Sequence, residues 1–150
     1  MNSEHPAEDA ARLEHLEQIE DLFDEYAPEF DEQLLSKLEY KVPALLCELL
    51  ERHSPDRRWR RALDLGCGTG LAGAALRAHV TEHLAGVDVS ARMLERCASS
   101  RAGVYDELER GELVGALARR ALAGERFDLL VAADALCYVC LLYTSPSPRD

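Results

Sequence analysis

Residues 64–70 read Asp-Leu-Gly-Cys-Gly-Thr-Gly, a D-x-G-x-G-x-G pattern that follows the apolar residues Ala62 and Leu63. The residues after it, 71–80, have helical composition, so this glycine loop is predicted to join a strand to a helix. Glycines at such a junction let the backbone turn sharply and approach a ligand closely. The third glycine of the dinucleotide fingerprint G-x-G-x-x-G would fall at position 71, which is leucine. The spacing therefore departs from that fingerprint.

Two acidic residues accompany the glycine loop. Asp64 stands two residues before the first glycine, where it would suit a ligand carrying an ammonium group. Asp88 ends the second apolar run, 84–89, and an acid at that place can accept hydrogen bonds from both hydroxyls of an adenosine ribose. The alternative for Asp88 is a turn or N-cap residue, because a helix is predicted over 91–100 with Ser90 as an N-cap candidate. The position after the second strand favours the ribose interpretation.

The rest of the chain alternates strands with helices. A weak strand is predicted at Val104-Tyr105, a helix over 112–122 and a strong strand over 127–132. Such alternation is typical of a parallel sheet covered on both faces. The sequence therefore predicts an α/β fold, a Rossmann-like doubly wound sheet of about four strands. These four strands correspond to the N-terminal half of such a sheet.

A helical lead-in precedes the sheet. Apolar residues at helical spacing predict one helix over 9–27, which Pro28 ends, a second helix through Leu34, Leu35 and Leu38, and a third from Pro43. Residues 1–50 hold 14 acidic residues and three basic ones, which accounts for the whole net charge of −11. We interpret this acidic run as the solvated face of the helices.

Composition narrows the class of protein. The chain is 47% hydrophobic and 30% charged, which excludes collagen, low-complexity disorder and a disulfide-dense miniprotein. Its acidic balance is a poor match to nucleic-acid phosphates or anionic lipid, so we expect neither a nucleic-acid nor a membrane partner. No signal peptide pattern or long apolar run stands in the sequence, and the expected location is cytoplasmic.

The strand-loop-helix motif and the two acids resemble class I S-adenosylmethionine-dependent methyltransferases, over residues 62–139. The resemblance implies that Asp64 faces the ammonium group of S-adenosylmethionine and that Asp88 holds its ribose. It further implies that Met93 packs on the adenine, although Met93 fits a helix core equally well. Glu112-Leu113 stands where the family places an acid and an apolar residue beside the adenine amino group, with Glu for the usual Asp. The implied cofactor-binding residues are Asp64, Gly66, Cys67, Gly68, Gly70, Asp88, Val89, Met93, Glu112, Leu113 and Tyr26.

Tyr26 enters that set through the lead-in. The segments 23–31 and 38–43 look like small bacterial-type methyltransferases, in which a tyrosine of the lead-in can close over the cofactor. The alternative is that Tyr26 is the last apolar position of the helix over 9–27.

The resemblance implies methyl transfer by in-line displacement, in which the protein mainly aligns the reactants. We expect no catalytic triad and no metal. Asp134 follows the strand predicted over 127–132 and is a candidate for contact with the substrate, because open α/β sheets bind substrates at the carboxyl ends of their strands. The alternative is that Asp134 caps a helix. The methyl acceptor is expected to be a small molecule, although a carrier-bound acyl group and a protein side chain stay open. The alternatives are an NAD-dependent oxidoreductase, against which Leu71 argues, and a non-catalytic binding or assembly protein of the same fold.

The last residues, 140–150, resemble a translated sequencing adapter, so we expect them not to belong to the fold. This leaves a lead-in over 1–53 and a partial methyltransferase domain over 54–139. We expect the 150-residue chain to be a truncated piece that is unstable or inactive, because its last strand would lack a neighbour. Cys137 and Cys140 form a C-x-x-C pair only across this boundary, so we do not interpret them as a metal site.

Overall fold

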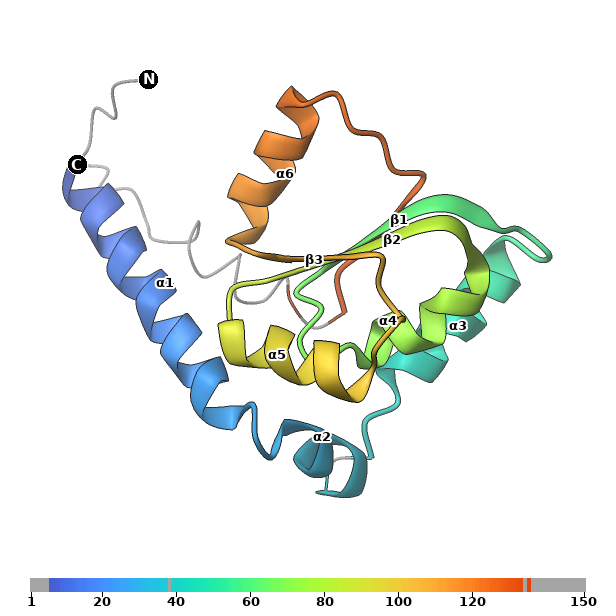
Figure 1. The fold of residues 1–150 in the computed structure, drawn as a ribbon, viewed down its shortest axis with the longest axis horizontal. Helices are drawn as coiled ribbons and strands as arrows, with labels where there is room; N and C mark the ends of the chain where they lie inside the picture. Colours follow the sequence, from blue (N-terminus) through green and yellow to red (C-terminus); the bar gives the residue numbers. More distant parts are fainter. Residues whose placement is uncertain (1–5, 38, 134, 136–150) are drawn as a thin grey trace, which may run out of the picture.

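Four parallel strands form the sheet in the computed structural model, which describes residues 6–37, 39–133 and 135 (Figure 1). The order across the sheet is β3-β2-β1-β4. The strands are β1 (Trp59–Leu65), β2 (Val80–Asp88), β3 (Glu107–Arg110) and β4 (Leu129–Val131). In the register, Asp64 of β1 lies opposite Gly86 of β2 and Val131 of β4. The central strands β1 and β2 are mostly buried, as expected of a sheet covered on both faces.

Helices cover the two faces of the sheet, with α6 on one side and α4 and α5 on the other (Figure 1). Their bounds are α4 (Leu71–Leu76), continued by the 3₁₀ turn η2 (Arg77–His79), α5 (Ala91–Ser100) and α6 (Leu113–Leu122). Leu63 and Val87 point toward α6 and pack with Ala116. Side chains alternate between the two faces along a strand, so Ala62 of β1 and Leu84 of β2 point to the opposite face, where they pack in a second apolar cluster. This arrangement confirms the predicted Rossmann-like fold.

The third strand differs from its prediction. Val104 and Tyr105 lie in the loop before β3, and β3 itself is Glu107–Arg110. Its sequence, Glu-Leu-Glu-Arg, has no apolar run. Both of its acids instead pair with Arg120 of α6. A strand that faces its covering helix with charged side chains cannot be found by hydrophobic periodicity.

The lead-in is helical, as predicted, but its middle part is irregular. Its elements are α1 (Pro6–Tyr26), the single turn α2 (Phe30–Glu32), the π-helical turn η1 (Gln33–Lys37) and α3 (Val42–His53). Pro43 lies in the first turn of α3, where its missing N–H costs nothing. Leu38 lies outside the described residues. In Figure 1, α1 runs along one side of the domain beside α5, and α3 packs against α4.

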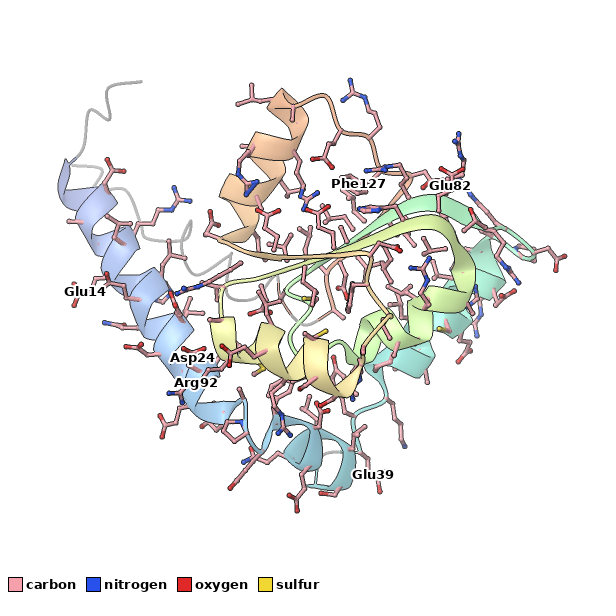
Figure 2. The ribbon with its side chains drawn as sticks, viewed as in Figure 1. Glu14, Asp24, Glu39, Glu82, Arg92 and Phe127 are labelled. Atoms are coloured by element: carbon pink, nitrogen blue, oxygen red, sulfur yellow. The ribbon has the colours of Figure 1, made fainter. Side chains whose placement is uncertain are left out.

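The interpretation of the acidic run as a solvated face is wrong for part of it. Glu14 points away from the domain, but Asp24 lies beside Arg92 at the contact of α1 with α5 (Figure 2). Asp24 Oδ1 accepts hydrogen bonds from the Ser90 hydroxyl and from the Arg92 N–H, the latter at 3.2 Å. Asp31 likewise accepts a hydrogen bond from the Thr69 hydroxyl, and it forms an ion pair with Arg101, the residue that follows α5. These acids attach the lead-in to the sheet domain.

Candidate functional site

The glycine loop leaves β1 and turns into α4. Gly66, Gly68 and Gly70 all have positive φ, of 73°, 53° and 90°. These are left-handed conformations that favour glycine. The N–H groups of Gly66 and Cys67 both donate to the Val87 carbonyl of β2, at 2.8 and 3.0 Å. The loop is thereby fixed at the carboxyl ends of the two central strands, where open α/β sheets bind their ligands.

Asp88 connects the end of β2 to the glycine loop. Its Oδ2 accepts the Gly68 N–H at 2.8 Å, and its Oδ1 accepts the Ser90 N–H at 2.9 Å. Burial raises the pKa of Asp88 above its ordinary value, while these backbone N–H groups counteract part of the rise. The N-cap of α5 is Ser90, whose Oγ accepts the Met93 N–H at 3.1 Å. Asp88 is therefore the last residue of β2, with its carboxylate held against the loop.

A cavity of about 320 Å³ lies between this edge of the sheet and the lead-in. Eight of the eleven predicted cofactor-binding residues line it: Gly66, Cys67, Gly68, Asp88, Val89, Met93, Glu112 and Leu113. The lead-in supplies the opposite wall with Leu16, Ile19, Phe23, Phe30, Leu34 and Tyr40. Segments up to about a hundred residues apart in the sequence thus form one mostly apolar site.

Three predicted residues do not line this cavity. Gly70 is the N-cap of α4, and a Cβ there would lie 2.7 Å from the Cys97 sulfur, so its role is steric. Tyr26 is 44% exposed at the end of α1. Phe23 faces the cavity instead, because it lies one turn earlier on the inward side of the helix. Tyr26 does not line the cavity in this structure, and its closing over the cofactor stays a prediction.

Asp64 is the third residue outside the cavity lining. Its side chain is fully buried behind the loop, and its Oδ2 accepts the Tyr105 hydroxyl at 2.6 Å. Its Oδ1 has no hydrogen-bond partner among the described residues. Burial raises the pKa of Asp64 to about 6, with a further rise from the nearby charge of Asp88 and an opposing effect of the Tyr105 hydrogen bond. Sequence reasoning missed Tyr105, since its only signal was that of a short apolar pair.

The buried Asp64 carboxyl predicts a pH-dependent difference between the protein and its Asp64→Asn variant. Because the pKa is raised on folding, ionising Asp64 costs stability as pH rises from its unfolded value through about 6. Between pH 4.0 and 7.5, the free energy of unfolding of the wild type should fall by about 2 kcal/mol relative to the variant. Urea denaturation at both pH values measures this change. A constant difference between the two proteins would contradict it.

Glu112 contributes to the cavity wall and also caps α6. Its carboxylate accepts the N–H groups of Val114 and Gly115 at 2.9 and 2.8 Å. Arg12 of α1 reaches the same carboxylate at 3.2 Å and so joins the lead-in to this side of the cavity. Negative charge is favourable at the start of a helix, so the capping role alone is a sufficient reason for an acidic residue at position 112.

Other features of the described residues add no second kind of site. Within the ranges the structure describes, no three His, Cys, Asp or Glu side chains are grouped as metal ligands, and no helix has the length and apolar character of a membrane span. Asp134, Cys137 and Cys140 lie outside the described residues.

A doubly wound parallel sheet with a glycine loop and an acid at the ends of its first two strands defines a Rossmann-like nucleotide-cofactor class. Comparison with known families narrows that class. The chain belongs to the methyltransferase domain family, whose match covers residues 62–142. Over 87 residues it is 37% identical to methyltransferase-like protein 27 of Homo sapiens. That alignment covers 57% of this chain and 34% of the human protein, so the chain spans about a third of the length of this relative.

Solved structures share the fold. DesVI of Streptomyces venezuelae superposes with a TM-score of 0.53 at 21% identity, covering 71% of this chain and 42% of that protein. The magnesium protoporphyrin IX methyltransferase of Synechocystis PCC 6803, solved with bound S-adenosylmethionine, gives 0.57 at 14% identity, covering 83% and 64%. At these identities the likeness concerns the fold.

Proposed function

We propose that this chain is the cofactor-binding part of an S-adenosylmethionine-dependent methyltransferase that acts on a small molecule. The observation that carries the proposal is the cavity at the carboxyl ends of β1 and β2, walled by the glycine loop and Asp88. Membership of the methyltransferase domain family supports it, and so does the bound S-adenosylmethionine of the Synechocystis enzyme. The net charge of −11 is a poor electrostatic match to a nucleic-acid acceptor, and the proposal is for a small-molecule acceptor in the cytoplasm.

The residues of the site fit this cofactor. A Cβ on Gly68 would meet nothing nearer than a Phe30 ring atom at 3.9 Å, so the backbone is open to a ligand on the cavity side. The Asp88 carboxylate lines the same wall and retains acceptor capacity beyond its two backbone N–H groups, which suits ribose hydroxyls. Met93 and Leu113 also line the cavity and offer apolar surface for the adenine.

Bound S-adenosylmethionine would supply a methyl group activated by the positive sulfonium. The described residues would then orient the reactants and exclude water. The lead-in performs the second task, because its aromatic side chains Phe23, Phe30 and Tyr40 close the cavity opposite the glycine loop. Water exclusion and alignment are the contributions that a displacement on an already activated carbon needs most.

Calorimetric titration of the full-length protein that contains this chain, with S-adenosylmethionine and with NAD, tests the proposal. We expect saturable binding of S-adenosylmethionine and at least about tenfold weaker binding of NAD, because position 71 lacks the glycine of the dinucleotide fingerprint. Tighter binding of NAD would refute the proposed cofactor. Transfer of a labelled methyl group to small molecules of a cell extract then separates an enzyme from a non-catalytic binding protein of the same fold.

A further inference from the structure

Tyr105 lies behind the glycine loop in a space that glycines create. A Cβ on Gly73 would collide with its hydroxyl, and one on Gly86 would lie 2.9 Å from a ring carbon. A Cβ on Gly70 would lie 3.1 Å from the ring. The ring therefore occupies a slot between α4 and β2 that any larger side chain at these positions would fill. The hydroxyl at the end of this slot donates to Asp64 Oδ2 at 2.6 Å.

The loop that carries Tyr105 is fixed on both sides of it. Arg101 donates to the Thr69 carbonyl at 2.9 Å, and Arg77 donates to the Val104 carbonyl at 3.2 Å. Asp106 accepts the Leu84 N–H of β2 at 2.7 Å. These bonds tie the loop to α4, β2 and the glycine loop, so the phenol meets Asp64 in a single arrangement.

The two oxygens of Asp64 have different surroundings. Oδ2 holds the Tyr105 hydroxyl, whereas Oδ1 is buried and lacks a partner among the described residues. A buried acceptor without a donor costs free energy, so such a group in a native structure needs an explanation, for example a functional role or a bound ion or water. We propose that Tyr105 is a positioning residue, which holds Asp64 so that Oδ1 remains available to the ammonium group of the cofactor. This inference rests on the proposed function and extends it to a residue outside the cavity.

The charges around Asp64 agree with this role. Burial and the carboxylate of Asp88 both raise the pKa of Asp64, and the Tyr105 hydrogen bond lowers it. Burial also raises the pKa of the Cys67 and Cys97 thiols, which therefore stay neutral beside it. Tyr105 itself stays protonated, because burial and Asp64 raise its pKa. The phenol is thus the described donor that favours the ionised form of Asp64.

The test compares the wild type with Tyr105→Phe, which keeps the ring and removes the hydroxyl. Two ligands are titrated calorimetrically: S-adenosylhomocysteine, which has the ammonium group, and 5′-methylthioadenosine, which lacks the amino-acid part. We expect the variant to bind S-adenosylhomocysteine about tenfold more weakly at pH 7.0, the effect of losing a hydrogen bond to a charged group. Binding of 5′-methylthioadenosine should change less than about twofold. The control Thr81→Val, which removes a hydroxyl that donates to the Trp59 carbonyl outside the cavity lining, should change neither.

Two further readouts separate positioning from a purely structural role. The tenfold loss should shrink at pH 8.5, because Asp64 then ionises without the help of the phenol. In a double-mutant cycle, Tyr105→Phe added to Asp64→Asn should cause no further loss, since the hydroxyl acts through that carboxylate. An equal loss for both ligands, a loss independent of pH or an additive cycle would each overturn the inference.

Failure of the inference differs from failure of the proposed function. If the wild type binds neither ligand, the proposed cofactor is wrong; if it binds both and Tyr105→Phe changes nothing, only the role of Tyr105 is wrong. Should Tyr105→Phe not fold, 3-fluorotyrosine in the wild type carries the test. The resonance of Tyr105, assigned by elimination from the other four tyrosines, should shift with S-adenosylhomocysteine but not with 5′-methylthioadenosine. Equal shifts with both ligands would overturn the inference.

Discussion

Replacing Asp88 with alanine is expected to weaken binding of S-adenosylhomocysteine by at least about 100-fold. The carboxylate accepts the N–H groups of Gly68 and Ser90, so its loss leaves two loop donors unpaired and frees the glycine loop from the end of β2. Under the proposed function, the same change also removes the acceptor for the ribose hydroxyls. Each lost bond to a charged acceptor contributes about 1.5–3 kcal/mol, and together they exceed the factor of 100. Calorimetric titration measures the change.

Asp128→Ala is the matched control for this prediction. Asp128 also accepts two backbone N–H groups, those of Arg60 and Arg61, at 3.0 and 2.8 Å. It lies at the amino end of β4, away from the cavity. Asp128→Ala should lower stability and leave cofactor affinity within about threefold. Equal loss of affinity in both variants would mean that Asp88 acts only through general stability.

The second large effect is expected on stability, from replacing Arg120 with alanine. Arg120 is 4% exposed and donates from α6 to the carboxylates of Glu107 and Glu109 on β3 and of Glu125. Its guanidinium carbon also lies 5.8 Å from the centre of the Phe127 ring. Removing the cation leaves the Glu107 carboxylate with only His83 and the Glu109 carboxylate with only the exposed Arg119 among its ion-pair partners in the described residues. The free energy of unfolding should fall by about 3 kcal/mol, measured by urea denaturation.

Arg119→Ala supplies the control for Arg120. It removes the same side chain one residue earlier on α6, where Arg119 is 59% exposed and pairs only at the surface with Glu109. A solvent-exposed pair contributes little, so this variant should lose less than about 1 kcal/mol. Similar losses in the two variants would show that burial of Arg120 does not decide the stability of β3.

Local patterns predicted the elements closest to the cavity. The helix over 91–100 and its cap Ser90 are as predicted, because capping and helical periodicity involve neighbours along the chain. The second strand and the glycine loop were found for the same reason. The third strand was missed, since its acids are paired with Arg120, a residue more than ten positions away. The second helix, predicted through Leu34 and Leu35, is present as the single turn α2 followed by the π-helical turn η1.

The sequence by itself therefore determined the doubly wound fold, the loop at residues 64–70 and the wall of the cavity formed by the ends of β1 and β2. Those features follow from glycine conformations, apolar runs and caps, all of which act within a few residues. Only the tertiary structure decided that acids of the lead-in attach it to the sheet domain, that Phe23 and not Tyr26 faces the cavity, and that Tyr105 bonds to Asp64. Each of these contacts joins distant segments, and their pairing depends on how the packed helices and strands bring those segments together.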